Sequence, residues 1–195
     1  MDHDGFAHAL LSDERRKWQD PYKISKAIGA RSGMTVADLA CGPGYFTLPL
    51  ASLVGEGGVV HAVDGSPTML EHLRERIAAS GGAGKTVKVV QADVTDTGIP
   101  TGSVDLALFA NVLHDLEDRA AFLAEVKRIC KPRATIVDID WKKARTKMGP
   151  PFEIRLSEAE SRKTLAAGGL RVTRSIDAGP YHYGLVCRQA PGGSR

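Results

Sequence analysis

The chain has little cysteine, and it contains no long apolar run. Its three cysteines, Cys41, Cys130 and Cys187, are odd in number and far apart, and they form no C-x-x-C pair. This pattern excludes a disulfide framework and predicts a reducing compartment, in which cysteines pack as small apolar residues. No stretch approaches the roughly 20 apolar residues that span a bilayer, and the polar, acidic first residues do not resemble a signal peptide. We therefore expect a soluble, cytoplasmic protein with no transmembrane segment.

Length and charge set further limits. The 195 residues can form one α/β domain with a full core, but they leave no room for a second domain. The net charge of +3 is small, and no repeat recurs along the chain. We expect an N-terminal helical extension or lid over residues 1–30, a single domain over 31–189 and a disordered tail over 190–195.

The order of apolar segments, glycines and prolines predicts alternating strands and helices. The expected strands are 34–40, 58–64, 86–92, 104–110 and 134–140, and the expected helices are 22–30, 45–54, 67–79 and 115–130. Ser157 and Glu160 then have the spacing of a capping box, which predicts a helix over 158–167. Two last strands, 170–176 and 181–188, are joined by a connection too short for a parallel crossover. The chain therefore predicts βαβ repetition that closes with an antiparallel hairpin.

Polar residues and glycines follow the ends of the first four strands. They are Asp38 with Gly42 and Gly44, then Asp64, Asp93 and Asn111. In a doubly wound sheet these positions converge on one crevice, where ligands bind. Asp64 lies about 20 residues past the glycine turn, a separation that places a carboxylate against ribose hydroxyls. The alternative is structural, since glycines also serve ordinary turns, and the aspartates can cap helices or form turns.

The glycine turn does not fit a dinucleotide site well, because the position of a third glycine holds Thr47. Four segments instead resemble the class I S-adenosylmethionine-dependent methyltransferases, in the branch that contains the ubiquinone and menaquinone biosynthesis methylases. These segments are V-A-D-L-A-C-G-P-G from Val36, A-V-D-G-S around Asp64, Q-A-D-V at 91–94 and V-D-L-A-L-F-A-N-V-L-H-D-L at 104–116. The resemblance runs from about residue 36 to residue 188, and it includes the closing hairpin.

The resemblance implies both a fold and a cofactor site. The fold is α/β: a doubly wound, mostly parallel sheet of seven strands in the order 3-2-1-4-5-7-6, with strand 7 antiparallel and helices on both faces. S-adenosylmethionine would be the cofactor, leaving as S-adenosylhomocysteine, with no metal. The implied contacts are Asp38 and residues 40–44 (Ala40, Cys41, Gly42 and Gly44) for the methionine end, Asp64 and Gly65 for the ribose, Met69 for the adenine face, and Asp93 and Val94 for the adenine edge. Asn111 would lie beside the sulfonium and the acceptor.

Transfer of a methyl group from a sulfonium needs alignment and exclusion of water more than a strong catalytic group. If the acceptor is a hydroxyl or thiol, a base can assist, and His114 is the candidate because it follows the fourth strand at the rim of the crevice. The alternative is that His114 contacts only backbone or solvent. Packing is the expected role of His61, His72 and Cys41.

The segment from Trp141 to Arg174 carries nine Lys or Arg residues against three Glu residues. This excess can recognise an acidic substrate or can form a solvated face. The chain lacks the N-P-P-[FY] signature of many amino-methylating nucleic-acid enzymes, and no aromatic residue lies within 142–151. We therefore expect a small or medium-sized acceptor, with nucleic acid disfavoured. Three alternatives stay open: a cofactor-binding regulatory module without turnover, an RNA or protein methyltransferase, and an NAD(P)-dependent oxidoreductase.

Overall fold

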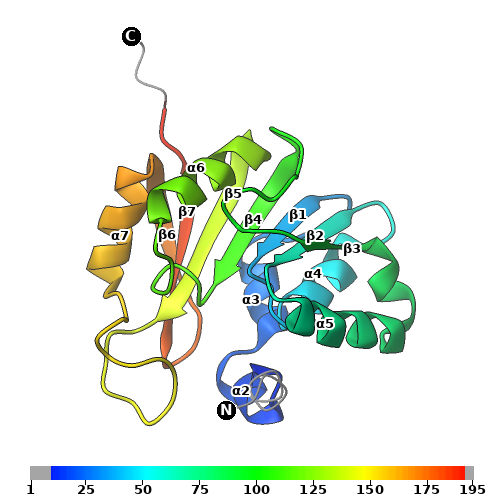
Figure 1. Cartoon of the computed structure of the whole chain (residues 1–195), viewed down its shortest axis with the longest axis horizontal. Coiled ribbons are helices and arrows are strands. Elements are labelled where there is room, and N and C mark those ends of the chain that lie inside the picture. The colour runs from blue at the N-terminus through cyan, green and yellow to red at the C-terminus, as the bar shows by residue number, and fades with distance from the viewer. Residues whose placement is uncertain (1–9, 192–195) are drawn as a thin grey trace.

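A seven-stranded sheet forms the centre of the molecule (Figure 1). The computed structural model describes residues 10–191. The strands are β1 (Thr35–Leu39), β2 (Val59–Asp64), β3 (Val87–Gln91), β4 (Val104–Ala110), β5 (Cys130–Trp141), β6 (Leu170–Asp177) and β7 (His182–Gln189). The helices are α2 (Asp13–Trp18), α3 (Pro21–Ala27), α4 (Thr47–Val54), α5 (Pro67–Ala79), a 3-10 helix (Gly81–Thr86), α6 (Arg119–Ile129) and α7 (Glu158–Ala167).

The strand order is β3-β2-β1-β4-β5-β7-β6, and β7 runs antiparallel to both of its neighbours. The predicted order and the predicted hairpin are therefore confirmed. In the parallel part, Asp38 on β1 lies between Ala62 of β2 and Leu108 of β4. The strand order reverses between β1 and β4, and in sheets of this kind the ligand-binding crevice lies outside the carboxyl ends of the strands at such a reversal.

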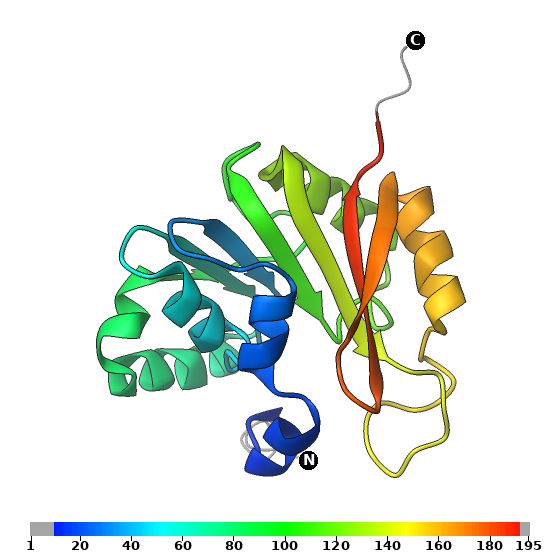
Figure 2. The ribbon, with the colours of Figure 1, turned by 180° about the vertical axis from the view of Figure 1, so that it is seen from behind.

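Helices cover both faces of the sheet (Figures 1 and 2). Apolar residues of α3 and α4 pack on one face, where α5 covers the β2 and β3 end. Residues of α6 and α7 pack on the other face, with Phe109, Phe122 and Leu123 among the most buried side chains. Because both faces are covered, the central strands are apolar almost throughout, as expected for parallel strands.

The helix starts follow from capping residues. Asp20 accepts hydrogen bonds from Tyr22 N–H and Lys23 N–H, and Ser66 accepts one from Met69 N–H. The predicted capping box of Ser157 and Glu160 is present at α7.

Several predicted boundaries were wrong, and the two largest errors have a structural cause. The helix predicted over 115–130 begins only at Arg119, because the Asp118 carboxylate caps it by accepting from Ala121 N–H. The strand predicted over 134–140 begins at Cys130, which pairs with Val104 before the register shifts at a bulge.

Two connecting segments lie at the carboxyl ends of β4 and β5 (Figure 2). One is the N-terminal segment with α2, which lies within the helical extension or lid expected over residues 1–30, and the other is the loop over 142–157. Residues 1–9 of the expected lid and residues 192–195 of the expected tail lie outside the described part. Among the described residues, no helix is long and apolar enough to cross a membrane.

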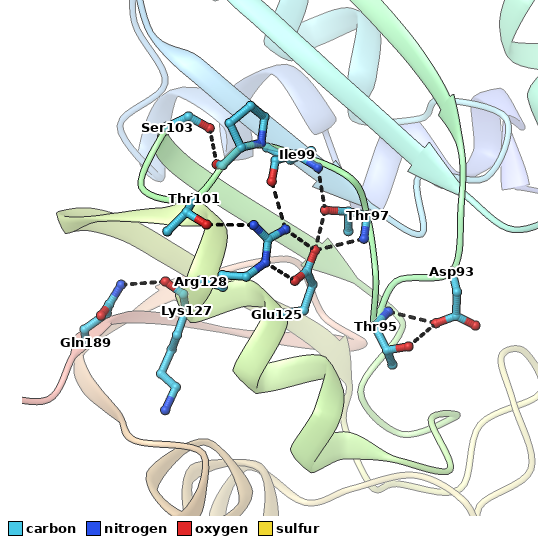
Figure 3. Close-up of polar contacts among 11 residues, drawn as sticks. Asp93, Thr95, Thr97, Ile99, Thr101, Ser103, Glu125, Lys127, Arg128 and Gln189 are labelled. Carbon is cyan, nitrogen blue, oxygen red and sulfur yellow. Dashed lines mark hydrogen bonds and ion pairs between the residues drawn. The ribbon is translucent and has the colours of Figure 1, made fainter.

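The irregular link between β3 and β4 is held in place by one carboxylate of α6 (Figure 3). Glu125 is 5% exposed and accepts hydrogen bonds from Thr97 N–H and Thr97 Oγ1–H at 2.8 and 2.6 Å. The Arg128 guanidinium donates to the same carboxylate and also to the Ile99 carbonyl oxygen. These bonds lower the pKa of Glu125 to about 2, with the Arg128 contribution the largest. They also fix the segment that begins with Asp93, at the edge of the crevice.

Candidate active site

The end of β1 continues into a turn with an unusual backbone. Ala40, Gly42 and Gly44 all have positive φ, at 53°, 54° and 81°. At Gly44 a Cβ atom would also collide with the Leu73 side chain of α5. The turn therefore needs glycine for its conformation and for the close approach of α5, and it brings the backbone of 40–44 to the rim of the crevice.

Asp64 joins this turn to the end of β2. Its Oδ2 accepts a hydrogen bond from Gly42 N–H at 2.7 Å, and its Oδ1 accepts one from Ser66 N–H at 2.8 Å. Each carboxylate oxygen has further lone pairs, so both can still accept hydrogen bonds from hydroxyl groups of a ligand. The carboxylate is thus held between the ends of β1 and β2.

Asp38 lies beneath the turn and is 2% exposed. Its burial raises the pKa of the carboxyl to about 7, although the hydrogen bond from Thr47 Oγ1–H, at 2.6 Å, opposes this shift. Thr47, which stands where a dinucleotide site would have glycine, therefore holds Asp38 in place. A nearby cationic group of a ligand would favour the charged form of this carboxyl.

The residues predicted for an adenine ring flank the ends of β2 and β3. Met69 lies in the first turn of α5 and is 7% exposed, whereas Gly65 is exposed and Val94 is half-buried. Asp93 forms a turn, because one of its oxygens accepts from Thr95 N–H and Thr95 Oγ1–H. These bonds lower the pKa of Asp93. The structural interpretation of Asp93 is thus correct, and its other oxygen stays available at an exposed position.

Cys41 is buried, and the loss of hydration raises the pKa of its thiol. This shift disfavours the thiolate, which is the form in which a cysteine acts as a nucleophile.

Asn111 follows β4 in a strained conformation, with φ at 63°. Its N–H donates to the Ile139 carbonyl oxygen at 2.7 Å, while its side-chain Oδ1 is buried without a partner among the described residues. A buried amide oxygen without a hydrogen bond is costly, and such costs persist mainly at functional positions. Asn111 therefore presents an unused acceptor at the end of β4.

His114 lies in the loop after β4 and is 8% exposed. Its Nδ1 is 2.7 Å from Oδ1 of Asp140, and its backbone N–H donates to Oδ2 of the same carboxylate at 3.1 Å. Asp140 lies near the end of β5 and is fully buried. The sequence analysis missed Asp140, although two acids in the otherwise apolar D-I-D-W segment were a signal that could have found it.

A second acid, Asp138, lies on the same face of β5. It is fully buried, and neither of its carboxyl oxygens has a partner among the described residues. Burial raises the pKa of Asp138 well above its usual range, and the negative charge of Asp140 adds to this shift. Burial among apolar side chains therefore favours the protonated form of Asp138.

Replacing Asp138 with asparagine is expected to stabilise the protein above about pH 5. A raised carboxyl pKa leaves stability intact below the unfolded pKa and removes it as the pH rises toward the folded pKa. Chemical denaturation from pH 4 to 8 should show that the stability of the variant relative to the wild type increases with pH.

Asp105 provides the matched control for this prediction. Bonds from Lys131 and Thr35 lower its pKa despite the opposing effect of burial. Asp105→Asn should therefore lose stability over the same pH range. If Asp138→Asn loses stability over this pH range, as expected for Asp105→Asn, the raised pKa of Asp138 would be contradicted.

Aromatic side chains join the end of α2 to the end of β5 and the start of β7. Trp18 contacts Trp141, Tyr181 and His182, with ring centroids 6.0, 5.3 and 5.6 Å away. His182 is 1% exposed, and burial lowers its pKa to about 3, so the ring is neutral. The N-terminal segment is thereby docked against the end of β5 and the start of β7.

Several basic residues after β5 form hydrogen bonds within their loop or ion pairs with α7. Arg155 is buried, and its guanidinium donates to carbonyl oxygens of Ala144, Met148 and Pro150 in its own loop. Lys143 and Arg162 pair with acids of α7, at 3.2 and 2.8 Å. At least three of the nine basic residues between Trp141 and Arg174 therefore make structural contacts. Among the described residues, no group of three or more His, Cys, Asp or Glu side chains is arranged to hold a metal ion.

The sequence matches the family model described as "Methyltransferase domain" over residues 37–137, which is more than half of the chain. The chain belongs to this methyltransferase family. The family assignment agrees with the resemblance carried by the four strand-end segments, and the matched residues contain all four strand ends of the crevice.

Individual relatives agree with the family. A demethylmenaquinone methyltransferase of Staphylococcus aureus is 30% identical over 132 residues, which are 67% of this chain and 52% of that protein. A ubiquinone/menaquinone biosynthesis C-methyltransferase of Shewanella pealeana is 31% identical over 158 residues, which are 80% of this chain and 60% of that protein. The chain thus spans only half to three fifths of the length of these curated relatives.

A solved structure matches nearly the whole chain. A SAM-dependent methyltransferase from Aquifex aeolicus has a TM-score of 0.90 and 33% sequence identity, covering 97% of this chain and all of that one. The fold, including the position of the antiparallel strand β7, is therefore that of a methyltransferase.

Proposed function

We propose that this protein is an S-adenosylmethionine-dependent methyltransferase that acts on a small or medium-sized molecule. The observation that carries the proposal is Asp64, whose carboxylate joins the glycine turn to the end of β2 while keeping lone pairs free at the crevice. The names of the relatives from Staphylococcus aureus, Shewanella pealeana and Aquifex aeolicus support the same activity.

The residues of the crevice fit this cofactor. The backbone of 40–44 and the Asp38 carboxyl suit the methionine end, with its ammonium group, and the free lone pairs of Asp64 suit two ribose hydroxyls. Gly65 lies beside the ribose position, Met69 offers an apolar surface to the adenine ring, and Asp93 with Val94 borders the adenine edge. The buried, unpartnered oxygen of Asn111 lies at the end of the neighbouring strand.

When bound, S-adenosylmethionine supplies a methyl group on a positively charged sulfonium. The protein must therefore align the acceptor and keep water away from the reacting atoms. The end of β4, with Asn111, provides one side of the acceptor position, and the aromatic cluster around Trp18 provides a cover. Deep burial of His182 within this cluster is consistent with a dry environment.

Three observations weigh against the alternatives. Thr47, hydrogen-bonded to Asp38, occupies the position at which an oxidoreductase would need a third glycine. The structural contacts of Lys143, Arg155 and Arg162 account for part of the basic segment and so weaken the argument for an RNA or an acidic acceptor. The unpartnered Asn111 oxygen favours an active enzyme over a regulatory module, because such a cost is expected where a ligand reacts.

The proposal can be tested by following a radiolabelled methyl group. The full chain is incubated with [methyl-3H]S-adenosylmethionine and a cell extract, and the products are separated into small molecules and precipitated macromolecules. We expect the label to appear with time in small molecules other than S-adenosylmethionine. This labelled product should be lost in the Asp64→Ala variant. Label found only in RNA or protein would overturn the choice of acceptor, and tight cofactor binding without labelled product would favour the regulatory module.

A further inference from the structure

The position of His114 is fixed from two directions. Asp140 binds both its ring and its backbone N–H, at 2.7 and 3.1 Å. From α6, the Arg119 guanidinium donates to the carbonyl oxygens of Leu113 and His114, at 2.7 and 3.1 Å. The loop after β4 therefore presents the imidazole in one orientation.

The bonds to Asp140 determine which nitrogen of His114 carries the proton. The Asp140 carboxylate accepts hydrogen bonds from His114 N–H and from Trp141 N–H, the latter at 2.7 Å. The Asp140 carboxylate thus acts as a hydrogen-bond acceptor toward two backbone N–H groups. It can accept in the same way from the His114 ring, and Nδ1 then bears the hydrogen. Nε2 then carries a lone pair, and none of the described residues forms a hydrogen bond to it.

Fixing His114 against Asp140 in this way carries a free-energy cost that a histidine serving only to pack would not need. The arrangement includes a fully buried carboxylate at Asp140, and it lies near a second buried carboxyl at Asp138 and an Asn111 with positive φ three residues before His114. A histidine that only fills space can be satisfied by one backbone carbonyl or by solvent. Preorganised groups of this kind are typical of sites that move a proton.

Resting on methyl transfer as the proposed function, we infer that His114 is the general base for an acceptor with a weakly acidic hydroxyl group and that Asp140 is its positioning residue. The acceptor hydroxyl gives its proton to Nε2 while its oxygen forms the new O–C bond to the methyl group. The S–C bond breaks with its electron pair staying on sulfur. The imidazolium, held by Asp140, later releases the proton to solvent.

The first test measures the tautomer directly and needs no acceptor. Histidine 15N NMR spectra are recorded for the full chain with S-adenosylhomocysteine, and the His114 signals are assigned by their loss in His114→Asn. We expect protonated Nδ1 and unprotonated Nε2 in the wild type, and a shift toward protonated Nε2 in Asp140→Asn. The exposed neighbour Asp115 gives the matched control, because Asp115→Asn removes a nearby charge without touching the bond to Nδ1. Protonated Nε2 in the wild type would overturn the inference.

The second test separates a base from a structural residue through the acidity of the acceptor. Rates of methyl transfer are compared for 4-methoxyphenol and for the much more acidic 4-nitrophenol, which is already ionised at pH 8 and needs no base. We expect His114→Asn to lower the rate with 4-methoxyphenol by about 100-fold or more, Asp140→Asn to lower it in the same direction, and the rate with 4-nitrophenol to change by only a few fold. His114→Asn keeps an N–H that can reach Asp140, so the loop should stay folded.

The outcomes distinguish this inference from the function on which it rests. Equal losses with both phenols, or no loss with either, would overturn the role of His114. A wild type that methylates aniline but neither phenol would overturn the hydroxyl acceptor. Failure of the folded wild type to bind S-adenosylhomocysteine in calorimetry would instead overturn the proposed function itself.

Discussion

Replacing Asp64 with alanine should weaken the binding of S-adenosylhomocysteine by about 100-fold. The carboxylate is expected to bind ribose hydroxyls, and it also holds Gly42 N–H and Ser66 N–H, which shape the two turns around the ligand. Hydrogen bonds to a charged group are worth about 1.5–3 kcal/mol each, and about 2.7 kcal/mol corresponds to a 100-fold change in affinity. Titration calorimetry on the variant and the wild type measures the difference.

Asp96 offers a matched control for this variant. It is an exposed aspartate in the link between β3 and β4, beyond the four strand-end positions. Asp96→Ala removes the same charge from the chain and should leave the affinity within about twofold. Equal affinities for the Asp64→Ala variant and the wild type would mean that the ligand does not use the end of β2.

Replacing Glu125 with alanine should cost about 3 kcal/mol of folding stability. The change leaves the buried Thr97 N–H without an acceptor and removes the partner of Arg128, and breaking a buried ion pair typically costs 3–5 kcal/mol. Because the Arg128 side chain is 38% exposed, we expect a loss at the lower end of this range. Denaturation in urea at pH 7 measures the change.

The pH dependence of the stability lost in Glu125→Ala tests whether the charge of Glu125 is responsible. The pKa of Glu125 is lowered to about 2, so its contribution is complete above the unfolded value near 4.5 and is lost as the pH falls toward 2. The difference between wild type and Glu125→Ala should therefore shrink on acidification. Glu125→Gln keeps an acceptor for Thr97 and should lose less stability than Glu125→Ala. A difference that does not change between pH 7 and pH 3 would show that the charge of Glu125 is unimportant.

Features encoded by neighbouring residues could be predicted from the sequence. The glycine turn, the caps at Asp20 and Ser66 and the capping box at Ser157 all act within a few residues, so their pattern was sufficient. The strand order was predicted by combining this pattern with the family resemblance. Boundaries failed where a tertiary contact decides them, as at β5, whose first residue pairs with Val104 across a bulge.

The parts of the site that depend on distant contacts could not be predicted. His114 and Asp140 are 26 residues apart in the chain, and their bond exists only because β4 and β5 are adjacent and parallel. Similarly, Trp18 meets His182 only when the N-terminal segment folds across the ends of the strands. Single residues could be proposed from the sequence, but their partners required the fold.

The central claim is that the four strand ends form an S-adenosylmethionine site, and ligand titration of the unmodified full chain tests it most directly. Calorimetry with S-adenosylhomocysteine should show one saturable site per chain, and prior saturation with this ligand should abolish the heat of adding S-adenosylmethionine. NADH should produce no binding heat. A folded sample that binds NADH at one site, and neither of the two sulfur compounds, would contradict the account.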